Sequence, residues 1–133
     1  MDMNDVNIFA VLTACVVSFA FGALWYSPLL FMKPWSGAAG VDPDAPIDNP
    51  GRVYPLTALL TIISVGAFAW FLGADPEPGR AVRAALMVGI GLIAASMAIN
   101  YQFAGRSLVH WAIDSGFHVV RLVLVGATLA LWP

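Results

Sequence analysis

The sequence predicts an all-α membrane protein, a single domain in which four transmembrane helices form an antiparallel up-down bundle. Two observations lead to this prediction. The 133 residues are 60% apolar and only 11% charged, whereas an average soluble domain carries about 25% charge. Four apolar runs are also long enough to cross a bilayer core, which takes about 20 residues of helix. They cover about residues 6–32, 53–74, 84–105 and 107–132.

The first run, residues 6–32, contains no charged residue. Asn4 or Asp5 precedes it as the expected N-cap, because a short polar side chain accepts hydrogen bonds from free amide groups. Pro28 lacks an amide hydrogen and pushes the residue before it away from helical geometry. We therefore expect the helix to end or kink at Pro28, and the stretch Phe31–Trp35 to lie along the membrane interface.

Residues 33–52 hold four prolines and three glycines. Because proline fixes φ and cannot donate a hydrogen bond, we expect an ordered or semi-extended loop here and no helix. Three aspartates in this segment could suggest a calcium-binding loop. The intervening prolines and the missing terminal glutamate favour a solvated acidic loop instead. The aspartates are Asp42, Asp44 and Asp48.

Short connections join the last three runs. The second run, 53–74, is followed by a tight turn at Asp75–Gly79, and the third run, 84–105, lies between Arg83 and Arg106. Helices joined by short links are antiparallel neighbours, so both chain ends should lie on one side. Two basic residues on that side and three on the other are too few for the positive-inside rule to assign an orientation.

Small residues recur at helical spacing in three of the runs. Lipid provides no hydrophobic driving force between helices, so close contact of small residues holds membrane helices together. We expect these faces to be contact surfaces, within one bundle in preference to between subunits. The faces are Ala10, Ala14, Ser18 and Gly22; Ala81, Ala85 and Gly89, with a second stripe at Gly91 and Ala95; and Ala112, Gly116, Gly126 and Ala130.

Five large aromatic residues lie near the predicted span ends. Amphipathic rings prefer the headgroup layer, so we interpret them as interfacial anchors in preference to ligand-stacking residues. They are Trp25, Tyr26, Trp35, Tyr54 and Trp132.

The fourth run, 107–132, is the only span that carries acidic, basic or histidine side chains. At about 100° per residue, His110, Asp114, His118 and Arg121 fall within an arc of about 80° and form a polar stripe. A charge at such depth costs about 2.5 kcal/mol or more, so it persists when it is paired or faces water. We expect Asp114 and Arg121 to neutralise each other as an ion pair, directly, through His118 or across a subunit interface.

Three further polar residues support the stripe: Asn100, Arg106 and Ser107. Asn100 lies about one turn inside the membrane boundary, so we expect it to hydrogen-bond a neighbouring helix. Ser107 or the near end of the stripe is the alternative partner. Cys15 is the single cysteine, which excludes a disulfide within the chain, and we expect it to be a packing residue.

Two segments of the chain resemble the bacterial membrane family known as domain of unknown function 1761. The first is the run GALWYSP at residues 22–28 with the aromatic residues after it, and its signature positions are Gly22, Trp25, Tyr26, Pro28, Phe31 and Trp35. The second comprises Asn100-Tyr101, Phe103, Arg106-Ser107, the run IDSGFH at 113–118, Gly126 and Leu131-Trp132. The resemblance implies a compact four-helix protein without an established activity. It also implies that the positions of Asp114 and His118 vary within the family, which weakens an ion-transport interpretation.

The polar stripe is compatible with four alternative functions. We favour a non-enzymatic scaffold or accessory protein that acts through helix contacts, because an ion pair would make the stripe structural. A small oligomeric channel or transporter would instead use the stripe as a hydrated pathway. A metal or haem site at His110, Asp114 and His118 would need a symmetric dimer, because one helix supplies one side of a tetrahedral site. An intramembrane enzyme at Ser107 would lack a nucleophile elbow.

The sequence therefore predicts a protein without catalytic residues, bound metal or cofactor. Six basic residues against eight acidic ones, with no basic cluster, also exclude nucleic acid as a partner. We expect the lipid bilayer as its surroundings, in the bacterial inner membrane. Its expected partners are further copies of itself or a larger membrane complex.

Overall fold

The computed structural model describes residues 5–133, which contain helices and connecting segments but no strand. Four helical stretches are long and apolar enough to cross a membrane, which confirms the predicted fold class. They are α1 (Ile8–Trp25), α3 (Pro50–Leu72), the continuous stretch Pro78–Phe103 and α6 (Leu108–Ala130). The third stretch comprises α4 (Pro78–Leu86), the π-helical segment η2 (Met87–Ala94) and α5 (Ala95–Phe103).

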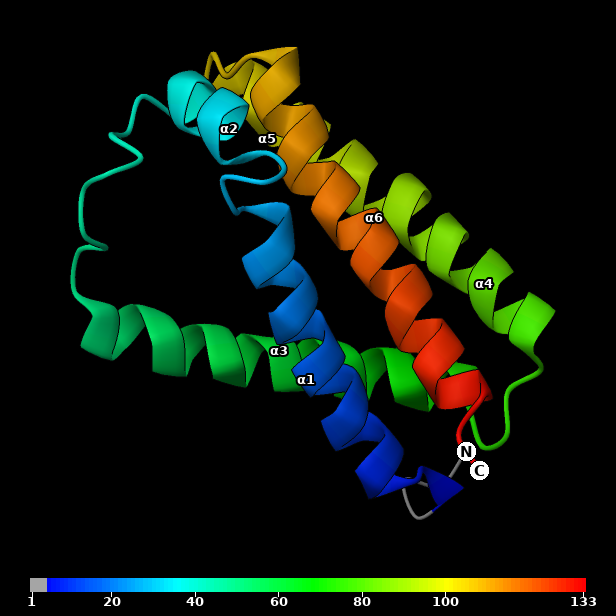
Figure 1. Cartoon of the computed structure of the whole chain (residues 1–133). Helices are drawn as coiled ribbons and strands as arrows, with labels where there is room; N and C mark the ends of the chain where they lie inside the picture. Colours follow the sequence, from blue (N-terminus) through cyan, green and yellow to red (C-terminus); the bar gives the residue numbers. More distant parts are fainter. Residues whose placement is uncertain (1–4) are drawn as a thin grey trace.

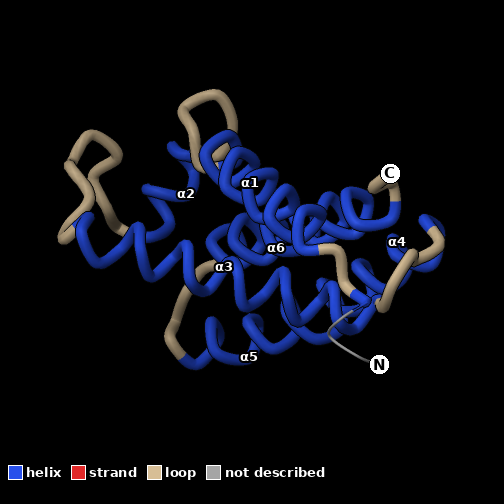
Figure 2. The backbone as a smooth tube through the Cα atoms, turned by 90° about the horizontal axis from the view of Figure 1, so that it is seen from below, coloured by secondary structure: helices blue, strands red, loops and turns tan. Residues whose placement is uncertain are grey.

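The helices are arranged around α6 (Figures 1 and 2). Helix α6 lies between α1 and the α4–η2–α5 stretch, and α3 crosses the other helices at a steep angle (Figure 1). The buried core lies where the C-terminal half of α3 meets α1, α4 and α6. Its members include Val11, Ala14, Val65, Phe68, Leu72, Ala85, Leu122 and Val125.

Helix α1 begins later and ends earlier than the apolar run predicted. Its N-cap is Asn7, whose Oδ1 accepts hydrogen bonds from the amides of Phe9 and Ala10 at 2.9 and 3.3 Å. Asp5 is therefore not the cap, and Asn4 lies outside the described residues. The helix ends at Trp25, ahead of Pro28, so the break that this proline predicted is confirmed.

A short helix, α2 (Met32–Ala39), occupies the first part of the segment that we expected to be loop throughout. That expectation was wrong because Pro34 falls in the first turn, where amide groups have no partner within the helix and a missing donor costs little. Gly40 ends α2 in the left-handed conformation at φ 71°, which glycine adopts without steric cost. The three aspartates follow in the exposed, non-helical part of this connection.

The third stretch also begins earlier than predicted, at Pro78 instead of near residue 84. The side chain of Glu77 caps it by accepting the amides of Gly79 and Arg80 at 2.8 and 2.7 Å. Proline at the first helical position suits this start, because its φ is already helical. The turn at 75–79 is therefore shorter than expected.

The π-helical segment η2 was not predicted. It packs against α6 at Gly89, where an added Cβ would lie 3.0 Å from the Cα of Val119. The indole Nε1 of Trp111 on α6 also donates to the carbonyl of Ala94 at 2.9 Å. The missing side chain at Gly89 lets η2 approach α6 closely, and the hydrogen bond from Trp111 then links the two segments.

The small-residue faces are contact surfaces in part. Ala10, Ala14 and Ser18 of α1 are at most 3% exposed, and Ala81 and Ala85 of α4 are fully buried. Further along α6, an added Cβ on Gly126 would lie 3.2 Å from the carbonyl oxygen of Ala81, so α4 and α6 approach closely there. Gly91 and Ala95 of the second stripe are exposed in this chain, as is Ala112, so these positions form no contact face within the bundle.

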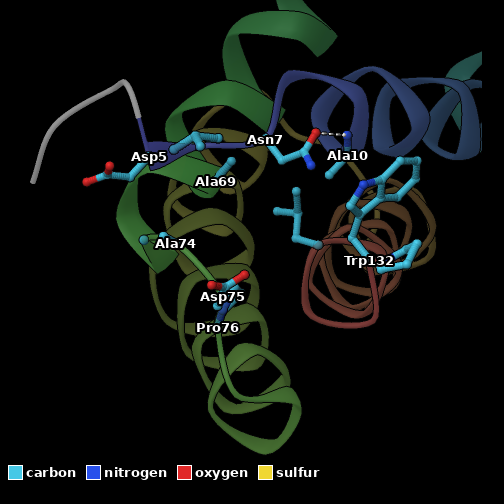
Figure 3. Close-up of a pocket in the computed structure, with 12 residues that line it drawn as sticks. Asp5, Asn7, Ala10, Ala69, Ala74, Asp75, Pro76 and Trp132 are labelled. Atoms are coloured by element: carbon cyan, nitrogen blue, oxygen red, sulfur yellow. Dashed lines mark hydrogen bonds between the residues drawn. The ribbon is translucent and has the colours of Figure 1, made fainter.

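The beginning of α1, the turn between α3 and α4, and the C-terminal residues gather at one end of the molecule (Figures 1 and 3). They enclose a small cavity of about 70 Å³. The ring of Trp132 lies beside Asn7 and Ala10 (Figure 3). The two ends of the described chain therefore lie together, as expected for an even number of spans.

Candidate functional site

The polar stripe lies on one unbroken helix, α6, but the structure divides it into two sites. Ser107 caps this helix, and its Oγ accepts the amide of His110 at 3.1 Å. Asp114 lies in a cluster of donor side chains at the end of the bundle near α2. Arg121 lies about two turns further along, beside a cavity next to α3.

Four side chains surround the carboxylate of Asp114, and we call these five residues the Asp114 cluster. The hydroxyl of Tyr26 and the indole Nε1 of Trp35 donate to Oδ1 at 2.7 and 2.8 Å. The hydroxyl of Tyr101 donates to Oδ2 at 2.5 Å, and Nε2 of His110 lies 3.2 Å from the same oxygen. The partners come from the C-cap of α1, from α2, from α5 and from α6 itself, so the cluster ties these four segments together.

The cluster takes up most of the hydrogen-bonding capacity of the acid. An ionised carboxylate offers about four lone-pair sites; three hydrogen bonds occupy most of them, and Nε2 of His110 lies close to Oδ2. Hydrogen bonds to an ionised acceptor are roughly twice as strong as those between neutral groups. The Asp114 side chain is only 15% exposed, yet its charge is balanced by donor groups and requires no arginine.

Aromatic rings enclose the Asp114 cluster. Tyr26 contacts Trp35 and Phe117 with ring centroids 5.6 and 5.4 Å apart, and Tyr101 contacts His110 at 5.1 Å. These separations are typical of favourable aromatic pairs. The rings therefore hold the donor groups in position and limit access of water to the carboxylate.

The other signature residues of the first segment pack beside this cluster. Trp25 donates its indole Nε1 to the carbonyl of Ile113 at 3.0 Å and contacts Phe31 with centroids 4.5 Å apart. An added Cβ on Gly116 would lie 3.3 Å from the Trp25 ring, and one on Gly22 would lie 3.4 Å from the Phe117 ring. Both glycines thus allow aromatic rings to lie flat between α1 and α6.

Trp25, Tyr26 and Trp35 therefore do more than the interfacial anchoring that we expected, because each directs its N–H or O–H toward α6. Tyr101 was missed as a site residue, although it stands in the second resembling segment. Its position directly after Asn100 was the available signal. A tyrosine near the end of one span can reach, with its hydroxyl, an acid near the beginning of the next span.

The supporting polar residues lie elsewhere. Asn100 is exposed and makes no side-chain hydrogen bond within residues 5–133, so the expected contact with a neighbouring helix was wrong. Its neighbour Tyr101 points toward the stripe instead. Arg106 is exposed in the connection before α6, and its amide donates to the carbonyl of Tyr101 at 2.9 Å. Gly105 permits this turn because its φ is 66°.

Arg121 does not pair with Asp114 within this chain, so the expected direct ion pair was wrong. Its Nη2 donates to the hydroxyl of Ser64 on α3 at 2.8 Å, and its guanidinium carbon lies 6.0 Å from the centroid of the Phe117 ring. The two charged residues are seven positions apart, which separates them by about 10 Å along the helix axis. The short aspartate side chain cannot cross that distance, and its oxygens already accept three other hydrogen bonds.

Arg121 lines a cavity of about 710 Å³ between α1, α3 and α6, which we call the Arg121 cavity. Its polar lining includes Ser18, Ser64 and His118, and its apolar lining includes Phe19 and Leu60. The cavity exists because α3 packs against the bundle only through its C-terminal half. Val65, Phe68, Ala69 and Leu72 are buried there, whereas Leu56, Leu59 and Leu60 in the other half are about half exposed.

Two polar atoms that line or border the Arg121 cavity have no hydrogen-bond partner in the described part of the chain. They are Nε of Arg121 and Oγ of Ser18, on side chains whose residues are 5% and 3% exposed. Buried polar groups are nearly always hydrogen-bonded in folded proteins. Both atoms are buried in the cavity wall, so Arg121 and Ser18 keep unused hydrogen-bonding capacity beside the cavity.

Residues 5–133 contain no group of three or more histidine, cysteine, aspartate or glutamate side chains placed to hold a metal ion. Cys15 is buried, as a packing residue would be. Comparison with curated proteins and with solved structures finds no match. A family model described as "Protein of unknown function (DUF1761)" matches residues 9–130.

Proposed function

The chain belongs to the DUF1761 family of proteins of unknown function, and from this premise we propose that it is a non-enzymatic membrane scaffold or accessory protein. It acts through helix contacts with further copies of itself or with a larger membrane complex. We place it in the bacterial inner membrane. The observation that supports this proposal is the convergence of three hydrogen bonds on the two Asp114 oxygens, with Nε2 of His110 3.2 Å from one of them.

An acid that relays protons or binds a passing cation needs a free lone pair and access to water. Hydrogen bonds from Tyr26, Trp35 and Tyr101 take up most of the Asp114 lone pairs, and its side chain is only 15% exposed, so it has little capacity for either role. Its hydrogen bonds instead join segments that are up to 88 residues apart in the chain. The acid thus stabilises one arrangement of the helices, as a scaffold requires.

The scaffold proposal also fits the apolar faces that remain outside the bundle. Large apolar side chains are exposed along α3 and on η2, among them Leu59, Ile63, Met87 and Leu92. Such faces contact lipid acyl chains or other membrane helices. A helix with one packed half and one free half, as in α3, offers a surface of this kind.

The size of the assembly in its native membrane tests the proposal. We expect the full chain, extracted in a mild uncharged detergent, to migrate in native gels well above the mass of one copy in its micelle. The matched comparison is the same chain purified and then diluted into excess detergent. Migration as a single copy in all gentle extracts would contradict a scaffold role.

The second candidate is a small oligomeric channel or transporter that uses the polar stripe. The observation in its favour is that His118 and Arg121 both line the Arg121 cavity. Chloride efflux from proteoliposomes distinguishes the two functions. A scaffold leaves the efflux rate equal to that of empty liposomes, whereas a conduit raises it and loses the increase in Arg121→Gln.

A further inference from the structure

We propose that the Arg121 cavity binds a single-chain lipid with a carboxylate headgroup, whose charge pairs with the Arg121 guanidinium. The apolar chain of this lipid would lie in the groove between α1 and the free half of α3. This inference goes beyond the scaffold function and does not depend on it. It rests on an unpaired buried cation, on the shape of the cavity, and on the depth of the cation along α6.

The first argument is the charge of Arg121. The residue is 5% exposed, and its one hydrogen bond in the described chain goes to the neutral hydroxyl of Ser64. A guanidinium stays protonated in proteins, and a buried charge without a counter-charge is strongly unfavourable. Asp114 cannot serve, because its oxygens are occupied. An acid supplied by a ligand completes the site.

The second argument is the set of polar residues that line the same cavity. Nε of Arg121 and the hydroxyl of Ser18 on α1 have no hydrogen-bond partner in the described chain, and both atoms lie buried in the cavity wall, so a ligand would reach them once the two side chains turn toward it. His118 lies one turn before Arg121 on α6 and also lines the cavity. A carboxylate has two oxygens that match the planar guanidinium fork, and it can accept a further hydrogen bond from a hydroxyl.

The third argument is size. Pockets that enclose small molecules typically measure about 300–1,000 Å³, and the Arg121 cavity, at about 710 Å³, lies in that range. A transmembrane helix of 20 residues is a cylinder on the order of 2,000 Å³, so a partner helix would not fit inside. The apolar lining, which includes Phe19, Leu60 and Ile93, suits an alkyl chain.

The fourth argument is depth. Arg121 stands near the middle of the 23-residue helix α6, far from either headgroup layer. A phosphodiester headgroup remains charged and stays at the interface. A long-chain carboxylic acid can approach in its neutral form, because desolvation favours the protonated state of an acid. The depth of the cation therefore favours a carboxylate over a phosphate.

Equilibrium dialysis of radiolabelled oleate against the full chain, purified in an uncharged detergent, tests the proposal. We expect saturable binding at one site per chain, no competition by methyl oleate, and little competition by lysophosphatidate. Arg121→Gln should weaken oleate binding about tenfold or more, as the loss of a charged hydrogen bond predicts. Arg106→Gln, which removes an exposed cation from a loop, is the matched control and should bind oleate like the parent.

A second variant keeps the test decisive if Arg121→Gln does not fold. Ala23 is exposed and lines the cavity, so Ala23→Trp should fill the groove while leaving Arg121 in place. We expect this variant to lose oleate binding. Unchanged binding in either variant, or equal competition by methyl oleate, would overturn the proposal. Equal competition by lysophosphatidate would overturn the carboxylate assignment, and a lipid-free dimer that Ala23→Trp separates would show that a second copy covers the groove.

Discussion

Asp114 is the residue on which the end of the bundle near α2 depends. Its two oxygens accept hydrogen bonds from aromatic side chains of three other segments. Each donor group belongs to a packed aromatic side chain, so fixing the orientation of that side chain costs little conformational entropy. A buried acid can thus be stabilised without a cation when several rigid donors converge on it.

Replacing this acid tests its structural role. Asp114→Asn keeps the shape but introduces an amide NH₂ where two of the donor groups now point, so at least one donor loses its acceptor. We expect the free energy of unfolding to fall by about 3 kcal/mol, the usual cost of disrupting a buried charged hydrogen-bond network. Thermal melting in detergent measures the change. Asp48→Asn in the exposed loop is the control, and a parent-like melting temperature for Asp114→Asn would contradict a structural role.

At the scale of elements, the contact between η2 and α6 depends on the absence of a side chain at Gly89. A Cβ there would lie 3.0 Å from the Cα of Val119, whereas a Cβ on Gly91 would meet nothing within 4 Å. Backbone atoms cannot move aside as the end of a flexible side chain can. The two glycines therefore form a natural pair for comparison within one segment.

Gly89→Ala should destabilise the protein by about 1–3 kcal/mol, the typical cost of overpacking a close contact. Gly91→Ala should be neutral or stabilising by up to about 1 kcal/mol, because alanine favours helix over glycine. Melting temperatures of the two variants check this difference. If both variants melted alike, the close approach of η2 to α6 would be refuted.

The start of α4 depends on the ionised side chain of Glu77. Hydrogen bonds from the amides of Gly79 and Arg80 hold the pKa of this carboxyl below its usual value, and Arg83 acts in the same direction. Because the pKa is lower in the folded state, the stabilisation is fully present above the ordinary glutamate pKa. It is lost as the pH falls through the folded-state pKa.

We therefore expect the melting temperature of the parent to fall between pH 5 and pH 3 by more than that of Glu77→Gln, which carries no titrating group at this cap. The melting temperatures of the parent and of Glu77→Gln should differ least at the acidic end of the range. Parallel melting curves across this range would show that the cap contributes nothing.

Some elements of this protein could be predicted from its sequence and others could not, for physical reasons. The four spans could be predicted because apolar length is a local property of the chain. Helix α2 was missed because the effect of Pro34 depends on whether it stands in the first turn or the interior of a helix. The partners of Asp114 could not be predicted either, since Tyr26 and Trp35 lie 88 and 79 residues away in the chain. Their convergence depends on how α1, α2 and α6 are rotated against one another.

At the scale of the whole molecule, the two polar sites on α6 serve different parts of the bundle. The Asp114 cluster joins α1, α2, α5 and α6, whereas Arg121 contacts α3. The sites share no hydrogen-bond partner. Substitutions separated by more than about 7–10 Å without shared partners usually have additive effects on stability.

This separation predicts the behaviour of a double variant. Arg121→Leu, in detergent without added lipid, should leave the melting temperature unchanged or raise it, because it removes an unpaired buried charge. In the double variant with Asp114→Asn, the change in the free energy of unfolding should equal the sum of the two single changes to within about 0.5 kcal/mol. Rescue of Asp114→Asn by Arg121→Leu beyond additivity would indicate that the two residues interact after all.

The central position of α6 has a consequence for how the protein is made. This helix follows the other three spans in the chain, yet it supplies Leu122 and Val125 to the core and the acid that Tyr26, Trp35 and Tyr101 contact. Until it inserts, the first three spans share little buried surface and carry three donor groups without an acceptor. The Asp114 cluster can therefore form only when α6 has joined the other helices.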